Sequence, residues 1–91
     1  MGVQPLNTKI KKETTQVRPL HVIADEIRKD WLSIYFGAKP YLEAMRTLDK
    51  ISESYGVDSG KSIVLYFLAN ATSWRGDVAR NIKKELNAMA K

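Results

Sequence analysis

Gly60-Lys61-Ser62 has the residue types that close a phosphate-binding loop. Such a loop needs four residues between its two glycines, so that successive backbone N–H groups surround the phosphates, and it follows a β-strand. Here only three residues separate Gly56 from Gly60, and the preceding segment has a helical pattern. We therefore interpret this segment as the start of a helix. The start of a helix attracts anions in general, so an anion held with the help of Lys61 remains a weaker alternative.

Acid–base chemistry has few candidates. His21 is the single histidine, and Asp25 lies one helical turn after it. A histidine that acts as a general base needs a positioned partner, and the sequence identifies none with certainty, although Asp25 could pair with His21. We interpret His21 as a structural or surface residue.

Three carboxylates, Glu43, Asp49 and Glu53, fall within one predicted helix. Neighbouring carboxylates can bind a hard cation or share a proton, but a cation site needs several converging oxygen ligands. Arg46 and Lys50 are interleaved among them, which is typical of a solvated helix face. The chain also has no cysteine. We expect no enzymatic activity, no cofactor and no metal.

Aromatic and apolar residues suggest contacts with another protein. Ser62–Ala71 is apolar in every direction around a helix, which is typical of a central helix or of an interface. Tyr35 and Phe36 lie in an apolar connector before Gly37 and Pro40, where the helical pattern breaks. The candidate protein-binding residues are Tyr35, Phe36, Leu65 and Tyr66.

Basic residues give the alternative, a nucleic-acid-binding protein. The net charge is +5, and the excess lies at the two ends of the chain. Lysines in an N-terminal arm and on one face of the last helix could together contact phosphates. The candidate residues are Lys9, Lys11, Lys12, Arg75, Arg80, Lys83 and Lys84.

The elements that must position these residues are all predicted to be helices. Apolar residues recur at steps of three and four, and Pro19 and Pro40 fit first turns. Gly56 fits the left-handed position after a helix. Asp58 or Ser59 can cap the next helix, and Ser73 the one after it. We predict an all-α fold, a compact bundle of four short helices at 19–32, 40–55, 59–71 and 74–89.

Residues 1–17 are predicted to form a flexible, disordered basic arm, and residues 18–91 a single helical domain. The core prediction places Ile63, Val64, Phe67 and Leu68 at the centre. Their predicted partners are Leu20, Ile23, Ile27, Met45, Leu48, Val78, Ile82 and Leu86. The chain shows no signal peptide and no apolar run of membrane-spanning length, so we expect a cytoplasmic protein that does not contact membranes.

Two segments, Ile34–Met45 and Ser62–Gly76, resemble small uncharacterised proteins encoded by bacteriophages and bacterial mobile elements. The resemblance implies a genomic setting and assigns no activity or functional residue. In that setting small non-enzymatic proteins act by binding: they block a host enzyme, counter a defence system or contact DNA. Our first hypothesis is thus a helical module that binds a host protein. Because one short bundle cannot cover every side of Ser62–Ala71, we also expect a homodimer at micromolar concentration.

Overall fold

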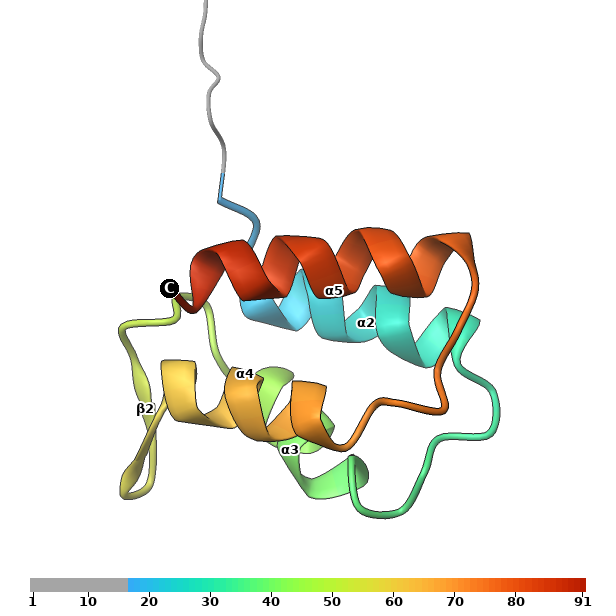
Figure 1. Ribbon diagram of the computed structural model, residues 1–91. Coiled ribbons are helices and arrows are strands. Elements are labelled where there is room, and N and C mark those ends of the chain that lie inside the picture. The colour runs from blue at the N-terminus through green and yellow to red at the C-terminus, as the bar shows by residue number, and fades with distance from the viewer. Residues whose placement is uncertain (1–16) are drawn as a thin grey trace, which may run out of the picture.

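The computed structural model describes residues 17–91, and the rest of the predicted arm lies outside the described residues. The described chain forms four helices and one two-stranded antiparallel hairpin (Figure 1). The fold is therefore mostly helical, as predicted, but it is not purely α. The elements in chain order are α2 Leu20–Asp30, α3 Lys39–Met45, β2 Ser54–Tyr55, β3 Asp58–Ser59, α4 Gly60–Ala69 and α5 Asp77–Met89.

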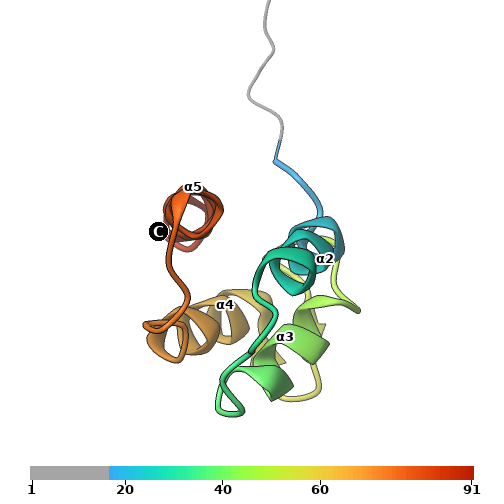
Figure 2. The same ribbon diagram turned by 90° about the vertical axis from the view of Figure 1, so that its right-hand side faces the viewer.

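The helices pack in a closed ring in which α2 contacts α3, α3 contacts α4, α4 contacts α5 and α5 contacts α2. Figure 2 shows this arrangement almost end-on, with α5 and α2 side by side above α4 and α3. The core between them is apolar, and no charged or polar side chain of the described range is buried in it. Each helix therefore covers the core with one face.

Helix α4 supplies the centre of this core, as its sequence predicts. Ile63, Val64 and Phe67 are buried, whereas Leu68 is only half-buried at the edge. Of the predicted partners on the other elements, one is wrong: Val78 is 41% exposed. The confirmed partners are Leu20, Ile23, Ile27, Met45, Leu48, Ile82 and Leu86.

An aromatic cluster closes one end of the bundle. The rings of Trp31 and Trp74 stack with centroids 5.7 Å apart, and Phe67 meets both edge-on at 6.2 and 6.3 Å. The indole N–H of Trp74 donates to a carboxylate oxygen of Asp30 at 2.8 Å, and the amine of Lys83 donates to the Trp74 carbonyl oxygen at 2.6 Å. The end of α2, the centre of α4 and the segment before α5 are thereby held together.

The predicted helix over 40–55 is wrong after its first two turns, since α3 ends at Met45. Turns follow, in which the Thr47 hydroxyl donates to the Ala44 carbonyl oxygen. The reason is a tertiary contact: the backbone N–H of Leu20 donates to the Asp49 carbonyl oxygen, and that of His21 to Leu48. The first N–H groups of a helix need acceptors, and Pro19, which precedes α2, supplies no side-chain cap.

The hairpin corrects the expectation that the chain forms helices alone. Ser54 pairs with Ser59 and Tyr55 with Asp58. Gly56 has the left-handed backbone predicted for it, with φ +63°, but it serves a tight turn between strands rather than a helix end. A period-two pattern cannot show in strands of two residues, so the sequence carries no clear strand signal.

The ends of the other helices differ less from their predicted positions. The first helix ends at Asp30, before the predicted Leu32. Ser59 caps α4 as predicted, because its hydroxyl accepts the backbone N–H of Ser62 at 3.1 Å. The predicted cap at Ser73 is wrong: α5 begins at Asp77, after Gly76 with φ +110°. That backbone conformation favours glycine. It lets the chain turn between the buried Trp74 and the start of α5.

Candidate functional site

Two of the predicted protein-binding residues form an exposed pair in the connector between α2 and α3. The rings of Tyr35 and Phe36 lie 4.9 Å apart, and Phe36 is 76% exposed. The backbone around them forms turns, in which the N–H of Ala38 donates to the Tyr35 carbonyl oxygen at 2.9 Å. The pair is thus presented by a hydrogen-bonded turn.

Gly37 allows the ring of Tyr35 to lie close to the backbone. A Cβ atom added at Gly37 would lie 2.5 Å from the Tyr35 ring and 2.9 Å from the side-chain oxygen of Asn70. The connector therefore lies against the carboxyl end of α4. Asn70 also donates from its side-chain amide to the Tyr66 carbonyl oxygen at 2.9 Å.

The other two predicted residues lie on the exposed side of α4. Leu65 is 43% exposed and Tyr66 47% exposed, although both lie within an almost wholly apolar helix. The ring of Tyr66 packs on that of Tyr41 in α3, with centroids 5.4 Å apart. Tyr41 is half-buried and packs against the core.

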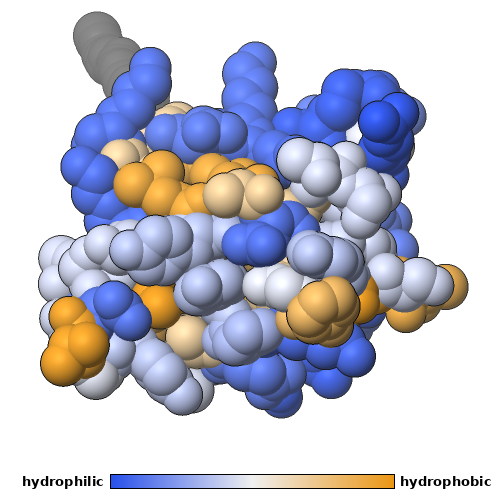
Figure 3. Space-filling view, turned by 60° about the horizontal axis from the view of Figure 1, so that its bottom comes forward, coloured by the Kyte–Doolittle hydropathy of each residue, from blue (hydrophilic) through white to orange (hydrophobic). Residues whose placement is uncertain are grey.

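Through Gly37 and Asn70 these contacts bring the Tyr35–Phe36 pair close to Tyr66, and Leu65 is the neighbour of Tyr66 in sequence. We call Tyr35, Phe36, Tyr41 and Tyr66 the aromatic surface. Figure 3, which brings the bottom of the view in Figure 1 forward, shows apolar areas scattered among pale side chains of intermediate hydropathy and hydrophilic ones. Tyrosine has such an intermediate hydropathy and still buries a large area on binding.

The predicted nucleic-acid-binding residues of the described range are partly engaged within the fold. Arg80 pairs with Asp77, and the amine of Lys83 contacts the ring and the carbonyl oxygen of Trp74. Burial, and then the nearby charge of Arg75, lower the pKa of Lys83. Arg75 and Lys84 are exposed. Lys9, Lys11 and Lys12 lie outside the described residues.

Arg18 is a residue that the sequence-based interpretation missed. Its guanidinium donates to both carboxylate oxygens of Glu85 in α5, at 2.8 and 2.9 Å, and to Glu26 in α2 at 2.5 Å. These hydrogen bonds raise its pKa. The arrangement fixes the chain beside α5 before α2 begins. A lone arginine next to a proline gives no sequence signal for such a contact.

The candidates for acid–base or metal chemistry do not converge. His21 lies 3.8 Å from Asp49, and Asp25 pairs with Lys29 instead. Glu43 pairs with Arg46, and Glu53 accepts the backbone N–H of Asp49, which lowers its pKa. No three histidine or carboxylate side chains of residues 17–91 are grouped as metal ligands.

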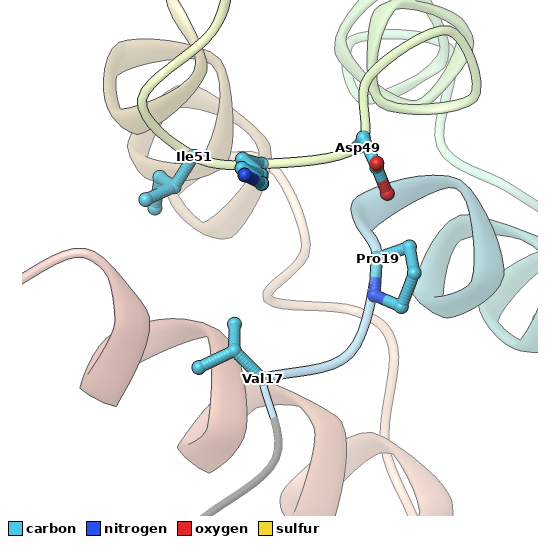
Figure 4. Close-up of a pocket in the computed structure, with 5 residues that line it drawn as sticks. Val17, Pro19, Asp49 and Ile51 are labelled. Atoms are coloured by element: carbon cyan, nitrogen blue, oxygen red, sulfur yellow. The ribbon is translucent and has the colours of Figure 1, made fainter.

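A pocket of about 440 Å³ lies where the chain enters α2. Val17 and Ile51 face its opening from opposite sides, and Pro19 and Asp49 line it as well (Figure 4). A shallower pocket of about 330 Å³ is lined by His21, Val22, Asp25 and Arg46. Neither pocket contains a serine, threonine or cysteine nucleophile beside a base, which acyl transfer through a covalent intermediate requires.

Comparisons with known protein families, with curated protein sequences and with solved structures give no match. No helix within residues 17–91 combines the length and the apolar character that crossing a membrane requires.

Proposed function

We propose that this protein is a non-enzymatic binding module that recognises another protein through the aromatic surface and Leu65. The observation that carries the proposal is the surface position of two pairs of contacting aromatic rings, Tyr35 with Phe36 and Tyr41 with Tyr66. Tyrosine and phenylalanine are enriched in the centres of interfaces, because they bury much area at a low cost in side-chain entropy. The resemblance of two segments to phage proteins supports a host protein as the partner, and an inhibitor of a host enzyme or of a defence system as the biological role.

The test is affinity capture from bacterial lysate treated with nuclease. We expect the wild-type protein to retain specific proteins that Phe36→Ala combined with Tyr66→Ala does not retain. Val78→Ala is the matched control, because Val78 is similarly exposed but lies on α5. Equal capture by all three proteins contradicts the proposal.

Gly37→Ala provides a second, subtler test of the same surface. The new methyl group must displace the ring of Tyr35, whereas the backbone of Gly37 has no positive φ that an alanine would strain. We expect weaker capture with an unchanged far-UV circular dichroism spectrum. Unchanged capture would mean that the orientation of Tyr35 is irrelevant to binding.

Nucleic-acid binding is the second candidate, and the position of Arg18 favours it. By pairing with Glu85, Arg18 places the start of the described chain, and with it the attachment of the lysine-rich residues 1–16, beside α5. Arm and helix could then contact one phosphate backbone. A mobility-shift assay with random-sequence DNA tests this: binding that falls steeply with added salt supports it, and no binding at low salt excludes it.

A homodimer remains our expectation for the protein without its partner, with the exposed side of α4 as the contact. Sedimentation equilibrium measures it. A single species near the chain mass of 10.3 kDa at concentrations up to about 100 µM contradicts it.

A further inference from the structure

The side of α4 that faces away from the core is unusual among the long helices of the described range. We call its residues Lys61, Leu65, Tyr66 and Ala69 the outer face of α4, and all four are exposed. Lys61 is the only charged residue within Gly60–Ala69, whereas α2 and α5 each carry several charges of both signs. Tyr66 makes this face continuous with the aromatic surface.

Charge pairing within the fold leaves the described surface positive. Every carboxylate of residues 17–91 except Asp58 contacts a basic side chain, the Trp74 indole or a backbone N–H. Several basic side chains, in contrast, form no ion pair with any described residue; Lys39, Lys61 and Arg75 are among them. Lys61 lies in the first turn of α4, and Arg75 lies in the connection after its carboxyl end. Asp58 is half-buried in β3.

We propose that the outer face of α4 binds an acidic amphipathic segment of the partner protein. This inference rests on the proposed function and specifies its partner. Apolar side chains of the segment pack on Leu65 and Tyr66, and its carboxylates meet Lys61 in the first turn of α4. A nucleic acid would supply the negative charge but no aliphatic side chain for Leu65 and Ala69. A second copy of this chain carries a net charge of +5 and complements this positive face less well than an acidic segment does, so the segment should displace the homodimer expected for the protein alone.

The experiment begins with a displayed library of random peptides selected on the immobilised full-length protein. We expect enrichment of peptides that combine Asp or Glu with Leu, Phe or Trp at helical spacing. Fluorescence anisotropy of the most enriched peptide then gives its Kd for wild-type protein and variants. Leu65→Asp should weaken binding by about tenfold or more, and Lys61→Gln by about two- to fivefold.

Matched controls separate the loss of specific contacts on the outer face from the effect of a changed net charge on the protein as a whole. Val78→Asp adds the same charge at a similarly exposed aliphatic residue of α5, and Lys91→Gln removes an exposed lysine that follows the same helix. Both should leave the Kd within about twofold of the wild-type value, as expected of substitutions outside the interface. Circular dichroism of each variant confirms that the fold is intact.

The outcomes that overturn the inference differ from those that overturn the proposed function. Peptides that need Leu65 but are not acidic, with an unchanged Kd for Lys61→Gln, refute the charge complementarity and leave protein binding intact. If no enriched peptide depends on Leu65 or Tyr66, both proposals fail. A labelled oligonucleotide that displaces the peptide from this face assigns it to nucleic acid instead. Self-association that needs Leu65 and persists in saturating peptide assigns it to a second copy.

Discussion

Replacing Phe67 by alanine should remove a large part of the stability of this protein. The Phe67 side chain is 0% exposed and its ring contacts both Trp31 and Trp74 edge-on. Burial of a phenylalanine and the cavity left by its removal are together worth about 3–5 kcal/mol. The two lost aromatic contacts place the expected value in the upper part of that range. A domain of this size has a total free energy of unfolding of about 4–11 kcal/mol.

Urea unfolding at equilibrium measures this loss with two signals. Far-UV circular dichroism follows the helices, and tryptophan fluorescence follows the core, because the two tryptophans of the chain are the two that contact Phe67. Coincident transitions justify a two-state free energy. The substitution can itself change the fluorescence of the two tryptophans, because both contact Phe67. The free energy of unfolding is therefore determined from each signal, and the two values are compared.

Phe36→Ala is the matched control, because it removes the same side chain from a position that is 76% exposed. We expect it to change the free energy of unfolding by no more than about 0.5 kcal/mol. A loss below about 1 kcal/mol for Phe67→Ala would place Phe67 outside the core. Equal losses for the two variants would refute the assignment of one ring to the core and the other to the surface.

Three further predictions concern the arm, one glycine and one carboxylate. Deleting residues 1–16 should leave the melting temperature almost unchanged; a decrease of more than about 10 °C contradicts this, because it corresponds to more than about 1 kcal/mol. Gly60→Ala should lower the melting temperature, since the added Cβ would lie 2.7 Å from the carbonyl oxygen of Ile51; an increase would show that the higher helix propensity of alanine, worth about 1 kcal/mol, prevails. The backbone N–H of Asp49 lowers the pKa of Glu53 from its ordinary value of 4.5. The ionised carboxylate therefore stabilises the fold above about pH 4.5, and this stabilisation is lost as the pH falls through the lowered pKa. The difference in melting temperature between wild type and Glu53→Gln should therefore shrink in acid, and a constant difference would contradict the hydrogen bond.

The parts of the fold that depend on local signals could be predicted from the sequence. Helix α4 is fixed by the apolar residues around Phe67 and by Ser59, whose capping role depends only on a residue three positions later. The connector was predicted from Gly37 and Pro40 in the same way. The sequence left open whether Tyr35 and Phe36 are exposed, and the structure places both at the surface.

The remainder depends on contacts between segments distant in sequence. The apolar pattern continues past Met45, but the helix stops there because the carbonyl oxygens of Leu48 and Asp49 accept N–H groups of α2. The half-exposed position of Tyr41 depends in the same way on where Tyr66 lies. Arg18 shows the same limit, since its acceptor Glu85 is 67 residues away. Periodicity describes a single helix and contains no information about such partners.

Different residues of α4 serve stability and recognition, and they lie on opposite sides of the helix. Phe67 and Val64 face the core, while Leu65 and Tyr66, their neighbours in sequence, face away from it. The Trp31–Phe67–Trp74 cluster packs against the buried side of α4 and sets the orientation of the helix. The residues of the outer face are therefore not needed to hold α4 in place. Leu65→Asp should accordingly weaken binding by about tenfold or more at an almost unchanged melting temperature, whereas Phe67→Leu should lower the melting temperature and leave the affinity of the folded protein intact. Variants that lose both properties together would show that the outer face is part of the folding core.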